Sequence, residues 1–336
     1  MKRQPFGNTP LTVTPLGLGM AALGRPGYIN LGHAVDLDHD YDRASMEAQA
    51  HEVLDAAWAA GVRYFDAARS YGAAEEFLGH WLRTRAINPA EVTVGSKWGY
   101  IYTADWQVVA EKHEVKEHTR PVLQRQFAES REHLGSYLDL YQIHSATLDS
   151  GVLENAAVLD ELARLRDGGL VIGLSLSGPG QADTLRRALP IERDGRPLFR
   201  SVQATWNLLA REAGAALADA HAAGVGIIVK EALANGRLTE RNTEPAFAAK
   251  RRLMEQAAAE VGATLDAVAL AAALVQPWAG VVLSGAARPE HLVSNANAVA
   301  LVRDRPEWLA EWLPRFDSLA EEPEQYWATR SALTWN

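Results

Sequence analysis

Eight short runs rich in β-branched and aromatic residues alternate along this 336-residue chain with segments whose apolar residues recur every three to four positions. The first pattern is typical of buried strands and the second of amphipathic helices. The candidate strands are Leu16–Met20, Val62–Asp66, Val92–Lys97, Leu138–His144, Val171–Ser175, Ser201–Thr205, Gly226–Lys230 and Gly280–Ser284. The candidate helices are Ser45–Ala60, Ala73–Arg83, Arg120–Leu134, Glu154–Asp167, Ala182–Leu189, Ala213–Ala223, Lys250–Val261 and Pro289–Val299. Because parallel strands need a crossover helix between them, this order predicts an α/β fold, a (β/α)8 TIM barrel.

Two segments lie outside the repeat. A Gly7-Asn8 pair between short extended runs predicts an N-terminal hairpin. The stretch from Pro306 onward predicts a C-terminal helical extension, whose tryptophans we expect to pack on the barrel exterior rather than to form an aromatic cage. These tryptophans are Trp308, Trp312, Trp327 and Trp335. Because no Pro-, Ser- or Gly-rich linker divides the chain, we expect residues 1–336 to form a single domain.

The charge balance argues against a nucleic-acid partner. The formal net charge is −9, and no basic cluster is interleaved with aromatic residues. The absence of cysteine excludes disulfides, thiolate metal ligands and a cysteine nucleophile, and we expect no metal site. The chain shows neither a continuous apolar leader nor an apolar window of about 18 residues, so we expect a cytoplasmic protein without membrane contact. Its expected partners are small molecules, and its oligomeric state stays open.

Residues Gly17 to Ala22 fit the G-x-G-x-x-G/A pattern of Rossmann dinucleotide-binding folds. In such folds the glycine loop opens a helix whose N-terminus binds the pyrophosphate. Here the chain continues through Gly24-Arg25-Pro26-Gly27, which breaks a helix, and the next strand begins only at Val62. The pattern therefore does not predict a Rossmann domain, and a dinucleotide would have to bind in another way.

Polar residues end three neighbouring strands. Asp66 ends the second strand and Tyr71 follows it in the next loop, while Lys97 ends the third strand and His144 the fourth. Each alone has an ordinary structural explanation, such as a helix cap or a rim charge. Barrel enzymes, however, carry their chemistry at the carboxyl ends of the strands. The four residues together therefore predict a catalytic site.

A tyrosine beside a lysine can transfer protons. The Lys97 ammonium would stabilise the Tyr71 phenolate, so we expect it to lower the tyrosine pKa from about 10 towards neutrality. Asp66 would keep Lys97 charged, and a neutral His144 would hydrogen-bond a substrate oxygen. This set of groups predicts proton transfer to or from a carbonyl or hydroxyl oxygen.

Eight sequence blocks, spread over nearly the whole chain, contain or accompany these four residues. They are LGLGMAALG, GVRYFDAARSYGAAEEFLGHWL, GSKWG, YLDLYQIH, LRDGGLVIGLSLS, VQATWNLLARE, ALANGRLT and SGAARPEHLVSN. In combination they resemble the aldo-keto reductase family. The resemblance implies that Asp66, Tyr71, Lys97 and His144 form a catalytic tetrad. It also implies that NADP(H) lies extended across the barrel mouth, with Gly19 and Met20 near the nicotinamide ribose.

The resemblance implies a cofactor site that departs from the family pattern. Ser175 and Gln203 match the residues that hold the carboxamide, but Leu176 replaces the usual asparagine. Lys230 and Glu231 stand where the family places a ring-stacking aromatic residue and a serine at the pyrophosphate. A cation facing the ring would disfavour the oxidised nicotinamide unless Glu231 neutralises it.

The 2′-phosphate end is expected to hold Arg288 and His291, which favours NADP(H) over NADH. The other cofactor contacts that the resemblance implies are Asp66, Leu233, Asn235, Gly236, Gly285 and Asn295.

The segments 21–44 and 98–118 are longer than a barrel needs and follow strands, so they are expected to form the substrate pocket. The expected substrate contacts are Tyr28, Trp98 and His144. Further aromatic residues that could line the pocket are Tyr100, Tyr102 and Trp106.

These observations predict an NADP-dependent oxidoreductase that reduces an aldehyde or ketone, or oxidises an alcohol or sugar, with Tyr71 as general acid and base. Two alternatives stay open. Lys97 could form a Schiff base in a lyase, or the altered cofactor positions could mark a nicotinamide-binding sensor with little turnover.

Overall fold

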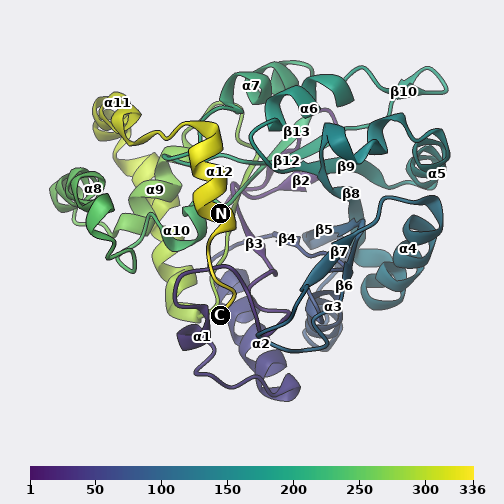
Figure 1. Ribbon diagram of the computed structural model, residues 1–336, viewed down its shortest axis with the longest axis horizontal. Helices are drawn as coiled ribbons and strands as arrows, with labels where there is room; N and C mark the ends of the chain where they lie inside the picture. The colour runs from purple at the N-terminus through teal and green to yellow at the C-terminus, as the bar shows by residue number, and fades with distance from the viewer.

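The computed structural model describes residues 1–336 and has a closed barrel of parallel strands at its centre (Figure 1). The barrel strands are β3 (Leu16–Gly19), β4 (Tyr64–Asp66), β5 (Thr93–Trp98), β8 (Leu138–Ala146), β9 (Val171–Leu176), β12 (Ser201–Thr205), β13 (Gly226–Lys230) and β14 (Val281–Ser284). They follow one another around the barrel in chain order, and β14 closes on β3. All eight predicted strands are present to within two residues, and the predicted TIM barrel is confirmed.

Helices surround the barrel on its outer side (Figure 1). Those that the sequence predicts are α2 (Arg43–Ala59), α3 (Ala74–Thr84), α4 (Arg120–Leu134), α5 (Ala156–Asp167), α6 (Gln181–Ala188), α7 (Gly214–Ala222), α8 (Ala248–Val261) and α10 (Pro289–Asp304). The start of α2 shows why the helices begin where they do. The Asp42 carboxylate accepts hydrogen bonds from the backbone N–H groups of Ala44 and Ser45, at 2.9 and 3.1 Å, and so caps the helix.

One barrel-side helix, α9 (Leu265–Leu274), escaped prediction. Apart from Asp266, its sequence, LDAVALAAAL, is apolar around the whole helix, and all but two of its residues are buried. A helix without a polar face shows no periodicity to detect. Gly262, at a φ of 65°, ends α8 just before it.

No single helix is long and apolar enough to span a bilayer. The segments Pro245–Val261 and Leu265–Leu274 meet that test only together, and they are bent by 87°.

The predicted N-terminal hairpin closes the bottom of the barrel. It consists of β1 (Gln4–Pro5) and β2 (Thr12–Val13), paired antiparallel. The fully buried Phe6 ring lies against Gly226 and Gly280, where an added Cβ would come within 2.5 and 3.2 Å of ring atoms. The glycines therefore leave the space that the ring fills, at the amino ends of β13 and β14.

The glycines of β3 serve the barrel and not a phosphate loop. A Cβ on Gly17 would come within 2.8 Å of the side chains of Tyr64 and Val281 inside the barrel. No helix follows β3 directly; a turn follows Met20, and the short helix α1 begins only at His33. This agrees with the prediction that the glycine pattern is no Rossmann motif.

Four segments gather at the carboxyl ends of the strands and form the barrel mouth. They are residues 20–42, which contain α1 (His33–Asp36); the hairpin of β6 (Tyr100–Tyr102) and β7 (Glu114–Lys116); residues 231–247; and residues 332–336. The C-terminal segment runs from α12 (Pro323–Ser331) across the barrel opening towards α1 (Figure 1). There Asn336 exchanges two backbone hydrogen bonds with Tyr28, at 3.1 and 3.2 Å.

The helical C-terminal extension is confirmed, with one difference in the placement of its tryptophans. Trp308 and Trp312 on α11 (Pro306–Arg315) and Trp327 on α12 are buried against neighbouring elements, as expected. Trp335 instead reaches the mouth and lines its cavity. The sequence could not show this, because the chain turns back over the barrel after α12.

We expect Phe6→Ala to lower the free energy of unfolding by about 3–5 kcal/mol, because the cavity left behind is walled by backbone that cannot collapse. Urea denaturation measures the change. Val109→Ala, at a side chain that is 85% exposed, is the control and should stay within about 0.5 kcal/mol of the parent. Equal effects of the two substitutions would show that Phe6 does not hold the barrel floor.

Candidate active site

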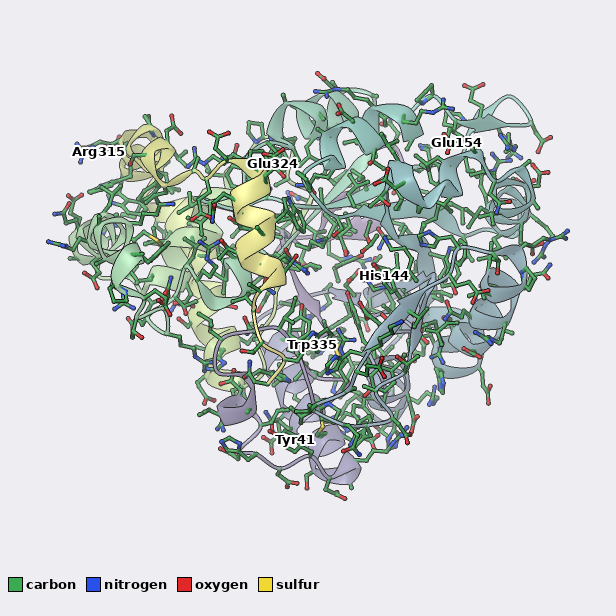
Figure 2. The ribbon with its side chains drawn as sticks, viewed as in Figure 1. Tyr41, His144, Glu154, Arg315, Glu324 and Trp335 are labelled. Carbon is green, nitrogen blue, oxygen red and sulfur yellow. The ribbon has the colours of Figure 1, made fainter.

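A cavity of about 480 Å³ opens at the carboxyl ends of the barrel strands. Small-molecule and cofactor sites usually have about 300–1,000 Å³. The centre of the cavity is lined by Asp66, Tyr71, His144 and Gln203. Figure 2 shows His144 and Trp335 around the barrel opening. The residues predicted from strand ends therefore meet at one place.

Lys97 and Asp66 form a fully buried ion pair directly below this centre. The Lys97 ammonium also donates to the Ala67 carbonyl at 2.8 Å. The Asp66 carboxylate accepts further hydrogen bonds from the Tyr64 hydroxyl at 3.1 Å and from the Gln203 amide at 2.9 Å. A buried charge must be paired and hydrogen-bonded, and here both partners are.

Tyr71 and His144 form the second half of the predicted tetrad. The Tyr71 hydroxyl lies 3.5 Å from His144 Nε2, and the Ser70 hydroxyl lies 3.3 Å from the other ring nitrogen. Lys97 Nζ lies 5.0 Å from the centre of the Tyr71 ring and makes its hydrogen bonds elsewhere. The phenol is therefore coupled directly to the imidazole and only at longer range to the lysine.

A charged network lies beside this centre. Arg330, from α12, donates to both carboxylate oxygens of Glu231, at 2.6 to 3.2 Å. Lys230 lies 3.6 Å from the same carboxylate and donates to Thr205 Oγ1 at 2.7 Å. Glu231 thus lies beside Lys230, as expected, but shares its single negative charge between Lys230 and Arg330, a site residue that was not predicted from the sequence.

The long side of the cavity runs from this network towards α10. Its lining includes Gly19, Leu233, Asn235, Gly236, Gly285 and Asn295, all predicted as cofactor contacts. Within it the Asn295 amide donates to Asp266 at 2.7 Å, and its carbonyl oxygen accepts from the Ser284 hydroxyl at 2.7 Å.

The model of the aldo/keto reductase family matches residues 15–310. The chain belongs to the aldo/keto reductase family. The family resemblance seen in the sequence is thereby confirmed.

Individual relatives are distant. D-threo-aldose 1-dehydrogenase from a Pseudomonas species is 30% identical over 189 residues, which are 52% of this chain and 54% of that protein. Pyridoxal 4-dehydrogenase from Microbacterium luteolum is 29% identical over 164 residues, 43% of either chain. The chain thus spans about half the length of these curated relatives.

Solved structures of similar proteins share the fold over most of their length. The holo form of an aldo-keto reductase from Bacillus halodurans has a TM-score of 0.72 at 20% identity, covering 97% of this chain and 99% of that one. A Pseudomonas aeruginosa protein assigned to the aldo-keto reductases has a TM-score of 0.62 at 26% identity, covering 88% and 95%.

The long side of the cavity fits the nicotinamide dinucleotide that the family uses. Asn235 Oδ1 is buried there without a hydrogen-bond partner, so a donor from a ligand would satisfy it. A Cβ on Gly285 would meet nothing within 4 Å, which leaves room beside the backbone. The backbone at Glu231 and Asn235 is left-handed, with φ of 56° and 55°; such conformations cluster at ligand sites.

The other side of the cavity has aromatic and charged walls suited to a substrate. Arg25 is buried, donates to Glu114 at 3.0 Å and lies 4.8 Å from the Trp335 ring. Tyr28 and Tyr100 complete this wall. Tyr28, a predicted substrate contact, therefore lines this wall of the cavity. Arg25, Glu114 and Trp335 also line it but were not predicted to be site residues.

Three predicted contacts do not line the cavity. Trp98 is fully buried and lies edge-on to His118, because Lys97 points into the barrel and the next residue of a strand points outward. Met20 is buried in the apolar core. Ser175 accepts a hydrogen bond from the Ser145 backbone at 2.8 Å, below the cavity surface.

Arg288 also does not line the cavity. It pairs with Asp38 and donates to the Val35 carbonyl at 2.9 Å. His291 does line it, 3.3 Å from a guanidinium nitrogen of Arg241. Of the two predicted phosphate ligands, only His291 therefore faces the cavity.

The predicted fall of the Tyr71 pKa is wrong for this structure. Burial, together with the charges of Tyr28 and Asp66, raises the pKa of Tyr71 well above its ordinary value, and Arg25 opposes this only in part. Lys97 does not pull the pKa of Tyr71 down because Asp66 cancels its charge.

Burial and the neighbouring cations, first of all Lys97, hold the pKa of His144 well below its ordinary value, so the imidazole is neutral, as predicted.

These pKa shifts predict how rates depend on pH. A tyrosine with a raised pKa keeps its proton, so the rate of carbonyl reduction should be level between about pH 6 and 9. The rate of alcohol oxidation needs the phenolate and should rise about tenfold per pH unit over that range. Measurements of kcat/KM in both directions at constant ionic strength test this. A reduction rate that falls from about pH 7 upward would mean that Tyr71 titrates near neutrality.

Glu231→Gln should lower the free energy of unfolding by about 3 kcal/mol, because it leaves two buried cations unpaired. The matched control is Glu311→Gln, which breaks an exposed pair with Arg315 and should cost less than about 1 kcal/mol. Urea denaturation measures both. Equal losses would mean that the buried network stabilises no more than a surface pair.

The same network predicts a pH dependence of stability. Arg330 and Lys230 lower the pKa of the Glu231 carboxyl from 4.5 to about 2, against the effect of burial. The stabilisation is therefore complete above pH 4.5 and is lost as the pH falls towards 2. The difference in stability between the parent and Glu231→Gln should shrink over this interval.

Proposed function

We propose that the protein is a nicotinamide-dependent oxidoreductase that interconverts a carbonyl compound and its alcohol. The observation that carries this proposal is the Tyr71 hydroxyl at 3.5 Å from His144 Nε2, at the centre of the cavity and above the buried Lys97–Asp66 pair. The dehydrogenase relatives support the same class of reaction.

Each residue has a definite task in this proposal. Tyr71 holds its proton at neutral pH, because of its raised pKa, and gives it to the carbonyl oxygen. Neutral His144 hydrogen-bonds the same oxygen and orients it, while Ser70 beside its other nitrogen fixes the ring. Lys97, paired with Asp66, lies 5.0 Å from the centre of the Tyr71 ring and forms the buried floor on which the phenol stands. The nicotinamide, when bound, supplies or accepts the hydride.

The residues that would hold the dinucleotide are those of the long side of the cavity. Gln203 and Gly19 lie beside the tetrad, and Leu233, Asn235 and Gly285 follow towards α10. The sequence favours NADP(H) through Arg288 and His291. Only His291 supports that preference here, since Arg288 is outside the cavity.

We further propose a cyclic substrate that carries hydroxyl groups. The rings of Tyr28, Tyr100 and Trp335 offer flat apolar faces, and the Arg25–Glu114 pair offers hydrogen-bond donors and acceptors. Aldoses and hydroxylated aromatic aldehydes have this combination, and relatives named for an aldose and for pyridoxal support it.

The lyase alternative receives no support. Lys97 is fully buried, paired with Asp66 and hydrogen-bonded to Ala67. An amine must be neutral and reachable to attack a carbonyl, and this ammonium is neither. The sensor alternative differs from the proposal only in turnover.

Tyr71→Phe tests the proposal. Because the substitution removes the proton donor and leaves the ring, we expect kcat for the reduction of an aldehyde panel to fall by about 10²–10⁴-fold. Binding of NADH or NADPH, followed by fluorescence, should stay unchanged.

Tyr102→Phe is the matched control. Its hydroxyl lies in a separate hollow with Arg43 and Trp106, so its rate should equal that of the parent. Equal rates for Tyr71→Phe and the parent would end the proposed mechanism, and cofactor binding without turnover by the parent would favour the sensor.

A further inference from the structure

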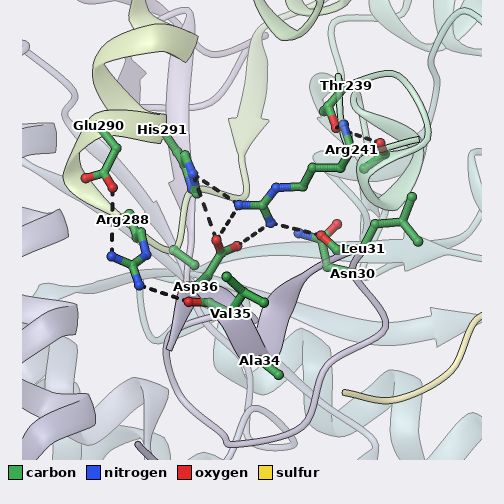
Figure 3. Close-up of polar contacts among 12 residues, drawn as sticks. Asn30, Leu31, Ala34, Val35, Asp36, Thr239, Arg241, Arg288, Glu290 and His291 are labelled. Carbon is green, nitrogen blue, oxygen red and sulfur yellow. Dashed lines mark hydrogen bonds and ion pairs between the residues drawn. The ribbon is translucent and has the colours of Figure 1, made fainter. Parts of the chain in front are cut away.

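The far end of the cavity carries a buried carboxylate. Asp36, on α1, is 3% exposed and lines the cavity. Arg241 grips it with both terminal nitrogens: Nη1 donates to Oδ2 at 2.7 Å and Nη2 donates to Oδ1 (Figure 3). Nη1 also donates to the Leu31 carbonyl at 2.9 Å. Both terminal nitrogens of Arg241 are therefore engaged.

The other basic side chains at this end also lie near carboxylates. His291 Nε2 lies 3.9 Å from the same Asp36 carboxylate and 3.3 Å from Arg241 Nη2. Arg288 is paired with Asp38 and lies outside the cavity lining. The segment 30–38 thus neutralises the basic residues that stand at the far end.

This end is where the cavity would hold the adenosine half of a dinucleotide. A nicotinamide beside Tyr71 would leave the side walled by Arg25, Glu114 and Trp335 to the substrate. The residues left to hold the rest of the dinucleotide would then be those of the other side, from Gly285 and the first turn of α10 to Asp36 and Arg241.

We propose that Asp36 sets the cofactor preference: it accepts hydrogen bonds from the adenosine ribose hydroxyls of NAD(H) and disfavours the 2′-phosphate of NADP(H). A carboxylate accepts hydrogen bonds from vicinal hydroxyls and repels a phosphate. A phosphate that took Arg241 for itself would leave Asp36 buried without its partner, which is costly. The inference rests on the proposed function, because it concerns the cofactor of the same site.

The proposal differs from the preference for NADP(H) drawn from the sequence. That preference assumed that Arg288 and His291 were free to bind phosphate. Arg288 meets its carboxylate partner 250 residues earlier in the chain, in a segment with no sequence pattern that ties it to α10.

Equilibrium titrations with NADH and with NADPH, followed by tryptophan fluorescence, test the inference. The parent should bind NADH about tenfold more tightly than NADPH or better. Asp36→Asn removes the repulsion and frees Arg241, so it should shift the ratio towards NADPH by about tenfold or more. The competitors 5′-AMP and 2′,5′-ADP should show the same reversal, since they report on the adenosine end alone.

Asp40→Asn is the matched control. It removes one negative charge close to the same segment, but its side chain is exposed, accepts a hydrogen bond from the Asp42 backbone N–H and lies outside the cavity. Its ratio of affinities should stay within about twofold of that of the parent.

The outcomes separate this inference from the proposed function. A parent that prefers NADPH, or a folded Asp36→Asn protein with an unchanged ratio, would overturn the role of Asp36 and leave the oxidoreductase proposal intact. Failure of the parent to bind either dinucleotide would end both. Because the parent is measured directly, the inference stays testable even where Asp36→Asn does not fold.

Discussion

The buried ion pair of Lys97 and Asp66 is the contact around which the barrel mouth is organised. It joins the carboxyl ends of two neighbouring strands, β4 and β5, and brings in Gln203 from the far side of the barrel. Such pairs seldom stabilise a fold, because the desolvation of both charges offsets their attraction. In this protein the pair acts through its electrostatics. Lys97 places a positive charge under Tyr71, but Asp66 cancels most of the field of that charge, so the Tyr71 phenol keeps its proton.

Other cations at the barrel mouth also lie beside carboxylates. Glu231 pairs with Arg330 and faces Lys230, Glu114 pairs with Arg25, and Asp36 pairs with Arg241. The three arginines each meet a carboxylate from a distant segment of the chain. The cavity is therefore polar but nearly neutral, although the protein as a whole carries a formal charge of −9. On the substrate side, such a lining suits ligands with hydroxyl and carbonyl groups.

The barrel and the meeting of Asp66, Tyr71, Lys97 and His144 at its mouth could be predicted from the sequence because their signals are local. A buried strand shows its own pattern, and Asp66, Lys97 and His144 each stand at the end of one. The partners of these residues could not be predicted in the same way. Arg330 and Trp335 reach the cavity because the C-terminal segment crosses the opening, and Asp36 meets Arg241 across 205 residues. Trp98 was predicted as a substrate contact but does not line the cavity. Neighbouring residues of a strand point to opposite sides, and Lys97, not Trp98, points into the barrel.

The two ends of the chain leave the barrel at opposite faces. The N-terminal hairpin covers the floor, whereas Asn336 bonds to Tyr28 beside the cavity. An affinity tag or surface anchor attached before Met1 would therefore hold the molecule by its base with its opening turned outward. A tag attached after Asn336 would lie at the opening of the cavity and would compete with ligands that enter it.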